Sequence, residues 1–242
     1  MNIEFIEFLV KNQVIRFGEF TLKSGRKSPY FINMGAVCNG KSSSELGKFF
    51  AKRMNEAFPK GLDIIFGPAY KGIPLAVSAS IAMGKVGWVF DRKEEKTHGD
   101  KGAFVGSQIT KDSRIVIIDD VMTTGGTKEE AIEKVKSIFG AEIKAVFIAV
   151  DREEVVTRCD DPVGASVSPS EKPRCDTRHI VSGESKLATE EFTEKTGIPV
   201  YSIEKISNIF EYLRKNKVEG KLVVDEKIYK AFLGYRELYG VK

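Results

Sequence analysis

Two adjacent carboxylates, Asp119 and Asp120, are the side chains of this chain best placed for chemistry. They follow the apolar run 115–118 and precede the loop 121–127, which is rich in glycine and threonine. Neighbouring carboxylates at the end of a buried strand repel each other and lose hydration, so a cation or hydroxyl donors must offset that cost. A ribose offers two vicinal hydroxyls, and the loop offers amides and hydroxyls for a phosphate. The pattern favours a ribose 5-phosphate site over an acidic turn that only caps a helix.

A helix is predicted directly after this loop, over residues 128–139. Thr127 and Glu130 have the spacing of a capping box, and Gly140 is a natural stop. The junction of a strand end with a helix N-terminus gathers free backbone N–H groups and the positive end of the helix dipole, which suits an anion. In open α/β sheets ligands bind at this edge. The sequence has no G-x-x-x-x-G-K-[ST] pattern, so the loop is not a Walker A loop.

The other segments alternate between buried strands and helices that would position these groups. Strands are predicted at 62–66, 86–90, 115–118, 143–150 and 200–203. Helices are predicted at 3–11, 42–57, 72–83, 128–139, 187–196, 207–213 and 226–239, with a second capping box at Ser42 and Glu45. This alternation predicts an α/β fold with a central parallel sheet flanked by helices.

The 242 residues suffice for one core, so a single domain is predicted over 1–242. Its hood, approximately 1–36, contains two short strands over 18–33 that form either a solvated hairpin or a lid with basic tips. The segment at approximately 92–106 is polar and glycine-containing, which predicts a flexible loop. After the fourth core strand the pattern fails, and proline and serine mark an irregular insertion at approximately 153–184.

The insertion holds Cys159, Cys175 and His179, which are possible ligands of a soft metal. The sequence offers no close pair of cysteines and no clear fourth ligand, so an irregular loop is the favoured interpretation. A disulfide between the two cysteines is disfavoured if the protein resides in a reducing compartment.

Composition and charge limit the classes of partner that the protein is expected to bind. Hydrophobic residues make up 42% and charged residues 30% of the chain, which is ordinary for a globular protein. The net charge of +4 suits an anionic small molecule and is weak evidence for nucleic acid. Apolar runs fall far short of a membrane span, and the first residues lack the pattern of a signal peptide. A cytoplasmic location without membrane contact is therefore expected.

Five segments in chain order resemble type I phosphoribosyltransferases. Residues 116–127 resemble the motif that binds phosphoribosyl pyrophosphate (PRPP), with the carboxylates Asp119 and Asp120 at its centre. Four other segments narrow the resemblance to the orotate-specific family: 20–31 resemble its hood, 67–72 its pyrophosphate loop, 92–99 its catalytic loop, and 151–152 the end of its base-recognising strand. The resemblance covers about residues 1–152 and resumes near Ala188.

The resemblance implies transfer of the phosphoribosyl group from PRPP to orotate, giving orotidine 5′-monophosphate and pyrophosphate in de novo pyrimidine biosynthesis. It implies Mg²⁺ brought by PRPP, with no direct protein ligand, and a homodimer in which each catalytic loop reaches the neighbouring site. It assigns catalysis to Lys96, His98, Asp119 and Asp120. It assigns PRPP binding to these four and to Tyr70, Lys71, Arg92, Lys93, Val121, Met122, Thr123, Thr124, Gly125, Gly126 and Thr127. It assigns orotate binding to Lys23, Phe31, Ile32, Thr123 and Arg152.

The residue types suit this reaction. Lys71, Arg92, Lys93, Lys96 and His98 could neutralise the charge that builds up on leaving pyrophosphate. A lone histidine is more often a solvated loop residue, but beside the lysines His98 is interpreted as a general acid or a counter-charge.

Two departures keep alternatives open. Ile32 stands where the family often has a second phenylalanine, and the double glycine of 124–127 resembles purine-specific relatives. Another base-specific phosphoribosyltransferase is the first alternative. A non-catalytic regulator that binds PRPP and nucleic acid is the second.

Overall fold

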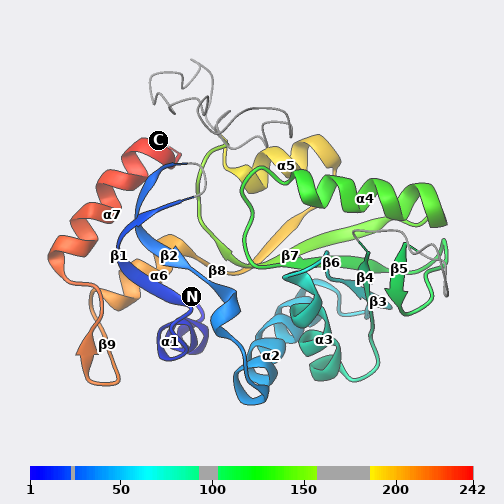
Figure 1. Ribbon diagram of the computed structural model, residues 1–242, viewed down its shortest axis with the longest axis horizontal. Coiled ribbons are helices and arrows are strands. Elements are labelled where there is room, and N and C mark those ends of the chain that lie inside the picture. The colour runs from blue at the N-terminus through cyan, green and yellow to red at the C-terminus, as the bar shows by residue number, and fades with distance from the viewer. Residues whose placement is uncertain (23–24, 93–102, 157–185, 242) are drawn as a thin grey trace.

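A computed structural model describes residues 1–22, 25–92, 103–156 and 186–241. A six-stranded sheet with strand order β5-β4-β3-β6-β7-β8 forms its centre (Figure 1). The parallel strands are β3 (Ile64–Phe66), β4 (Gly87–Asp91), β6 (Ile115–Asp119), β7 (Ile143–Asp151) and β8 (Val200–Lys205). The edge strand β5 (Phe104–Gly106) runs antiparallel to β4. The predicted parallel sheet is confirmed, but β5 was not predicted and shortens the segment that was assigned to a flexible loop.

Helices cover both faces of the sheet. In Figure 1, α2 (Gly40–Ala57) and α3 (Gly72–Met83) lie below it, while α4 (Gly126–Phe139) and α5 (Ala188–Thr196) lie above it. The first four residues of β6 are apolar because both faces of the strand are covered. Val116 and Ile118 pack into the core on the α2 and α3 side, whereas Ile115 and Ile117 pack against α4 and α5. All four side chains are fully buried, as expected for an inner parallel strand.

The hood is an antiparallel hairpin of β1 (Ile15–Thr21) and β2 (Lys27–Ile32), preceded by α1 (Ile3–Lys11) and followed by a short 3₁₀ helix (Met34–Ala36). It packs against α6 (Ile206–Leu213) and α7 (Glu226–Tyr239), which are joined by the small hairpin of β9 (Lys217–Val218) and β10 (Lys221–Leu222). Phe210 lies at the centre of this contact. Its ring stacks on that of Phe232 with the centroids 3.7 Å apart, and the rings of Phe17 and Tyr30 meet it edge-on. The expectation of a solvated hairpin is therefore wrong, because the inward face of the hood is anchored by aromatic residues from the C-terminal helices.

Both predicted capping boxes are wrong, for different reasons. The cap of α2 is Asn39, whose side chain accepts a hydrogen bond from the Ser42 N–H at 3.0 Å. The cap of α4 is Gly125, which adopts φ 83° and makes no capping hydrogen bond through a side chain. A Cβ atom at Gly125 would lie 2.6 Å from the ring of Phe192, so glycine is required there. No side chain caps α4, and the Lys128 N–H donates to the Gly125 carbonyl. The N–H groups of Gly126 and Thr127 are therefore the ones placed to meet an anion.

The first residues of the predicted insertion belong to the fold. Glu154 forms a bridge with Gly240 and Val155 a bridge with Leu187, and both side chains are buried. The insertion therefore begins after these residues, and the segment 157–185, with Cys159, Cys175 and His179, lies outside the described residues. Within the described ranges, no helix is long and apolar enough to cross a membrane.

An ion pair fixes the start of the two central strands. Arg114, just before β6, donates from Nε and Nη2 to the carboxylate of Asp63, just before β3, at 3.0 and 2.7 Å. These hydrogen bonds lower the pKa of Asp63 to about 2. Both side chains are about two-fifths exposed, so solvent screens the pair and its contribution to stability is small.

The Asp63–Arg114 pair predicts a pH-dependent stability. The folded-state pKa of Asp63 lies below its unfolded value near 4, so the stabilisation is complete above that value and is lost as the pH falls towards about 2. The melting temperature of Asp63→Asn should therefore lie below that of the wild type near neutral pH, by a few degrees at most. The difference should narrow between about pH 4 and pH 2. A constant difference over that range would contradict the role of the Asp63 charge.

Candidate active site

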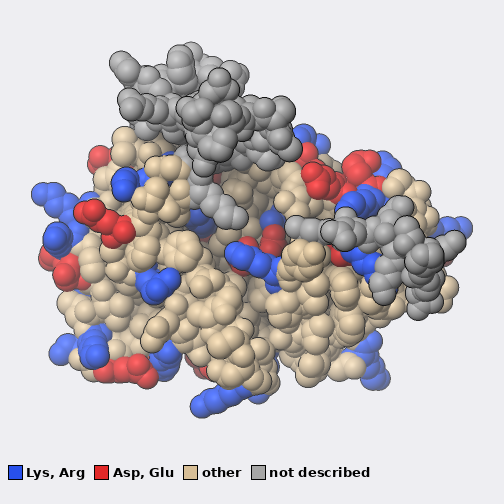
Figure 2. Space-filling model, in the orientation of Figure 1, with Lys and Arg blue, Asp and Glu red and all other residues tan. Residues whose placement is uncertain are grey.

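Several polar residues lie at the carboxyl edge of the sheet. Asp91, Asp119 and Asp151 end β4, β6 and β7, and the loop 67–72 follows β3. Figure 2 shows Lys and Arg atoms beside Asp and Glu atoms in the hollow near the centre of this face, between the hood side and the α/β side. The fold therefore brings two of the predicted PRPP segments, 67–72 and 119–127, to one place.

The two adjacent carboxylates have different partners. Asp120 Oδ2 accepts a hydrogen bond from Lys71 Nζ at 2.8 Å, across 49 residues of sequence. Asp119 Oδ2 accepts one from Lys128 Nζ. The side chain of Lys71 is 66% exposed, whereas that of Lys128 is only 7% exposed. One carboxylate is thus paired with a solvent-exposed ammonium and the other with a buried one.

Backbone N–H groups also hold the acidic turn formed by residues 119–121. Asp119 Oδ1 accepts from the Asp120 N–H at 2.9 Å, and Asp120 Oδ1 accepts from the Val121 N–H at 2.9 Å. The Asp120 carbonyl accepts from the N–H groups of Ala149 and Val150 on β7. These bonds offset part of the cost of placing two carboxylates side by side, which the sequence left unexplained.

The loop 67–72, which was predicted to hold pyrophosphate, is a tight loop held by glycines and by Asp91. A Cβ atom on Gly67 would lie 2.2 Å from the carbonyl oxygen of Gly72, so the two ends of the loop pack backbone to backbone. The Ala69–Tyr70 peptide bond is cis. Asp91 accepts from the Ala69 N–H at 3.1 Å and from Lys134 Nζ at 2.7 Å. Lys71 is directed to Asp120, and this hydrogen bond raises the pKa of Lys71.

The loop 121–127 presents backbone and hydroxyl groups. Thr123 and Thr127 are exposed and Thr124 is half-buried. Met122 was predicted to bind PRPP, but its side chain is buried in the core beside Phe192, so it can offer only backbone atoms. The arrangement suits a phosphate held by amides and hydroxyls at the start of α4.

Arg152 lies in a buried polar network that joins the hood, β7 and α7. Its Nη2 lies 2.7 Å from Glu154 Oε1, and its guanidinium stacks over the ring of Tyr30. Glu154 also accepts from the hydroxyls of Tyr30 and Tyr235 at 3.0 and 2.9 Å and from Arg26 Nη1 at 3.4 Å. Burial opposes the charge of Arg152, but the surrounding Tyr30, Glu154 and Tyr235 raise its pKa overall. The guanidinium remains charged, and any substrate anion must share it with Glu154.

Asp151 has a structural role. Its Oδ1 accepts from the Glu153 N–H at 2.9 Å, and its Oδ2 accepts from the Thr189 hydroxyl at 3.4 Å. Burial raises the pKa of Asp151 from its ordinary value. The residue joins the end of β7 to α5.

The comparisons with known proteins identify the family. A profile for the phosphoribosyl transferase domain matches residues 37–168. The chain is 39% identical to the orotate phosphoribosyltransferase of Bifidobacterium adolescentis, over 98% of this chain and 96% of that protein. It is 36% identical to the orotate phosphoribosyltransferase of Clostridium acetobutylicum, over 99% and 97%. The chain belongs to the orotate phosphoribosyltransferase family.

Solved structures of this family share the fold. The crystal structure of orotate phosphoribosyltransferase from Francisella tularensis matches with a TM-score of 0.74 and 35% identity, covering 98% of this chain and 99% of that one. The predicted fold class, a type I phosphoribosyltransferase-like sheet with a hood, is therefore confirmed. The similarity extends over nearly the whole chain, beyond the first 152 residues and the segment near Ala188 on which the sequence resemblance rested.

Two of the predicted orotate-binding residues, Phe31 and Ile32, lie on opposite faces of β2. Phe31 stacks on Phe20 with ring centroids 5.6 Å apart, and Arg16 lies over it. Ile32 packs against the core on the other face of β2. Adjacent strand residues point to opposite faces, so the two side chains cannot line one pocket together. Lys23 and the catalytic-loop residues Lys93, Lys96 and His98 lie outside the described residues.

Three residues that sequence reasoning did not single out contact the predicted site residues or loops: Asp91, Lys128 and Glu154. Asp91 could have been found, because it ends a buried strand just as Asp119 and Asp151 do. Lys128 and Glu154 carried no such signal, since their significance depends on burial and on partners that the fold supplies.

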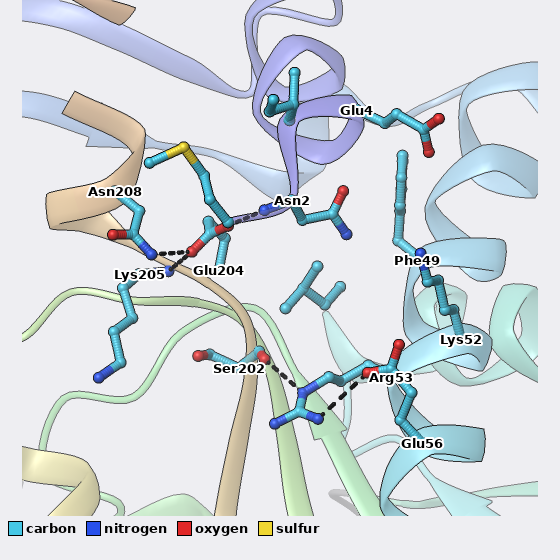
Figure 3. Close-up of a pocket in the computed structure, with 13 residues that line it drawn as sticks. Asn2, Glu4, Phe49, Lys52, Arg53, Glu56, Ser202, Glu204, Lys205 and Asn208 are labelled. Carbon is cyan, nitrogen blue, oxygen red and sulfur yellow. Dashed lines mark hydrogen bonds and ion pairs between the residues drawn. The ribbon is translucent and has the colours of Figure 1, made fainter. Parts of the chain in front are cut away.

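An open hollow of about 600 Å³ lies elsewhere, between α1, α2 and β8 (Figure 3). It shares no residue with the site. Glu204 on its wall accepts from Asn208 Nδ2 at 2.7 Å, from the Lys205 N–H at 2.9 Å and from the Asn2 N–H. Arg53 Nε donates to the Ser202 carbonyl on the outer edge of β8 at 3.0 Å. The lining side chains thus anchor the first helix and cover an edge strand.

Proposed function

We propose that this protein catalyses the transfer of a 5-phosphoribosyl group from PRPP to orotate, with release of pyrophosphate. The observation that carries the proposal is the hydrogen bond between Lys71 and Asp120, in a chain whose family is shown over almost its full length. It joins the loop that would hold the leaving pyrophosphate to the carboxylate that would hold the ribose. Both segments keep the residue types that the reaction requires.

The reaction breaks the bond between the anomeric carbon and the pyrophosphate oxygen and forms one to a ring nitrogen of orotate. The ribose gains positive charge in the transition state, so Asp119 and Asp120 favour it through their charge and by holding its hydroxyls. The 5′-phosphate would bind the amides and hydroxyls of 121–127. Lys71, Arg92, Lys93, Lys96 and His98 would neutralise the pyrophosphate as it leaves.

Orotate is an anion, and Arg152 is proposed to bind its carboxylate. The guanidinium is planar, charged and already fixed by Glu154 and Tyr30, so little conformational entropy is lost when substrate binds. Lys23, Phe31, Ile32 and Thr123 are proposed to complete the base pocket. Ile32 would contribute through its backbone, because its side chain faces the core.

Mg²⁺ is proposed to enter with PRPP and to be coordinated mainly by substrate oxygens and water. In the part of the chain that the structure describes, no group of three or more His, Cys, Asp or Glu side chains could hold a metal ion. The carboxylates of Asp119 and Asp120 are hard oxygen donors of the kind Mg²⁺ prefers, which fits an ion that arrives with its other ligands. The bound ion would neutralise charge on the pyrophosphate.

A homodimer is also proposed, with the outer face of α3 as the interface. Helix α3 is apolar on every side, a pattern typical of a helix that is buried all round. Pro74, Ile81 and Ala82 are nevertheless exposed in the single chain, Ile81 by 72%. A second copy of the chain would cover this face and bring the neighbouring catalytic loop towards the site.

The dimer predicts a specific effect of charge on α3. Ile81→Lys should shift the protein from dimer to monomer in sedimentation velocity, because burying a lysine opposite an apolar partner is unfavourable. Ile138→Lys, on the exposed side of α4 with 52% exposure, is the matched control and should remain dimeric. A monomeric wild type at micromolar concentration would contradict the proposal.

The function is tested by following orotate consumption spectrophotometrically. Orotate should be consumed only when both PRPP and Mg²⁺ are present, and pyrophosphate should appear in equal amount. Hypoxanthine, guanine, adenine and uracil in place of orotate serve as controls for another base specificity. Turnover of one of these bases without turnover of orotate would overturn the assignment.

A further inference from the structure

Lys128 is a buried ammonium in a place where a lysine is costly. It is the third residue of α4, at the positive end of the helix dipole, and only 5% of the residue is exposed. Burying an unpaired ammonium is strongly unfavourable, so its contacts must offset that cost. The position lies directly after the loop 121–127, so those contacts act on the PRPP segment.

Both contacts of Lys128 go to the acidic turn. Its Nζ donates to Asp119 Oδ2 and to the carbonyl oxygen of Val121, the latter at 3.2 Å. The ammonium is directed inward, with a side chain only 7% exposed, so it does not extend into solvent as a phosphate ligand would. The Lys128 amine therefore binds the carboxylate of Asp119 and the backbone carbonyl of Val121, the residue that follows Asp120.

The two carboxylates are consequently unequal. Asp119 has one oxygen bound to the Asp120 N–H and the other to the buried ammonium of Lys128. Asp120 is bound by the exposed ammonium of Lys71, which belongs to a different loop. Asp119 is therefore held by a buried cation, whereas Asp120 is held by an exposed cation that a polyanionic ligand could attract.

We propose that Lys128 is a positioning residue for PRPP: it fixes the Asp119 carboxylate and the Val121 backbone so that both meet the ribose in one geometry. This deepens the proposed function and rests on it for the identity of the ligand. Lys128 acts through Asp119 and does not touch the reacting atoms.

The decisive variant is Lys128→Met, which keeps the length and apolar stem of the side chain and removes the ammonium. The KM for PRPP should rise about tenfold or more, whereas the KM for orotate should change less than twofold. Lys195→Met is the matched control. It removes another lysine–carboxylate pair that involves α4, the one between Lys195 of α5 and Glu129 of α4 at 2.6 Å, and should leave both constants unchanged.

A double-mutant cycle separates positioning from general stability. If Lys128 acts largely through Asp119, the effects of Asp119→Asn and Lys128→Met on PRPP binding should be less than additive, because the contact with the Asp119 carboxylate is already altered in Asp119→Asn. Full additivity, or an unchanged KM for PRPP in Lys128→Met, would overturn the inference. If Lys128→Met fails to fold by circular dichroism, Lys128→Leu, which is shorter and also removes the donor, takes its place under the same criteria.

Calorimetry of PRPP binding without orotate distinguishes this inference from the proposed function. If the wild type binds PRPP but consumes no orotate, and Lys128→Met weakens that binding, the orotate assignment fails while the role of Lys128 stands. If the wild type consumes orotate and Lys128→Met binds PRPP normally, the function stands and the role of Lys128 fails.

Discussion

Arg152→Ala is expected to lower kcat/KM for orotate by about a hundredfold or more, the equivalent of losing one or two charge-assisted hydrogen bonds to a substrate carboxylate. The dissociation constant for PRPP should change little, because the contacts of Arg152 are with Glu154, Tyr30 and Tyr235, away from the acidic turn. Steady-state kinetics with each substrate varied in turn, together with calorimetry of PRPP binding, measure the two effects separately.

The polar network makes a control necessary for this experiment. Removing Arg152 also leaves the buried carboxylate of Glu154 without the guanidinium at 2.7 Å, so the variant should be less stable as well as less active. Tyr235→Phe removes a 2.9 Å hydrogen bond to the same carboxylate while keeping Arg152. It should lower the melting temperature and leave the KM for orotate nearly unchanged. If Arg152→Ala instead weakened PRPP binding and spared orotate, the base-site assignment would be wrong.

Asp120→Asn is expected to lower kcat by about a hundredfold to a thousandfold, the range typical for loss of one group aimed at charge that develops in the transition state. The amide keeps the shape of the side chain but removes the negative charge that would favour the ribose cation. It also removes the ion pair with Lys71, so the pyrophosphate loop loses its link to the PRPP segment. Single-turnover measurements would place the loss on the chemical step.

The control for Asp120→Asn is the same substitution in another aspartate–cation pair. Asp63→Asn breaks the contact with Arg114 at the opposite ends of β3 and β6. It should lower stability slightly and leave kcat within about twofold of the wild type, because surface ion pairs contribute little. An Asp120→Asn enzyme with near-normal kcat would exclude a role for this charge in the transition state.

Local sequence patterns were enough to predict the alternation of strands and helices. The run 115–118 followed by two aspartates, small residues and an apolar helix face predicted β6, the loop and α4, because these depend on periodicity and turn chemistry over short stretches. The helix starts were less predictable. Asn39 caps α2 in place of Ser42, since similar polar residues nearby compete for the same first-turn donors. Gly125 precedes α4 in place of Thr127, since the positive φ and the contact with Phe192 at that position require glycine.

The sequence by itself determined the strand–loop–helix units and the residue types at the carboxyl edge, and these sufficed to indicate the family. Only the tertiary structure decided the partners. Lys71 meets Asp120 across 49 residues, and Tyr30 meets Glu154 across 124. Lys128 is near Asp119 in sequence, but its inward direction follows from burial of α4 on the sheet. The physical reason is that charge and burial are properties of an environment, and the environment of each group is made by segments far away along the chain.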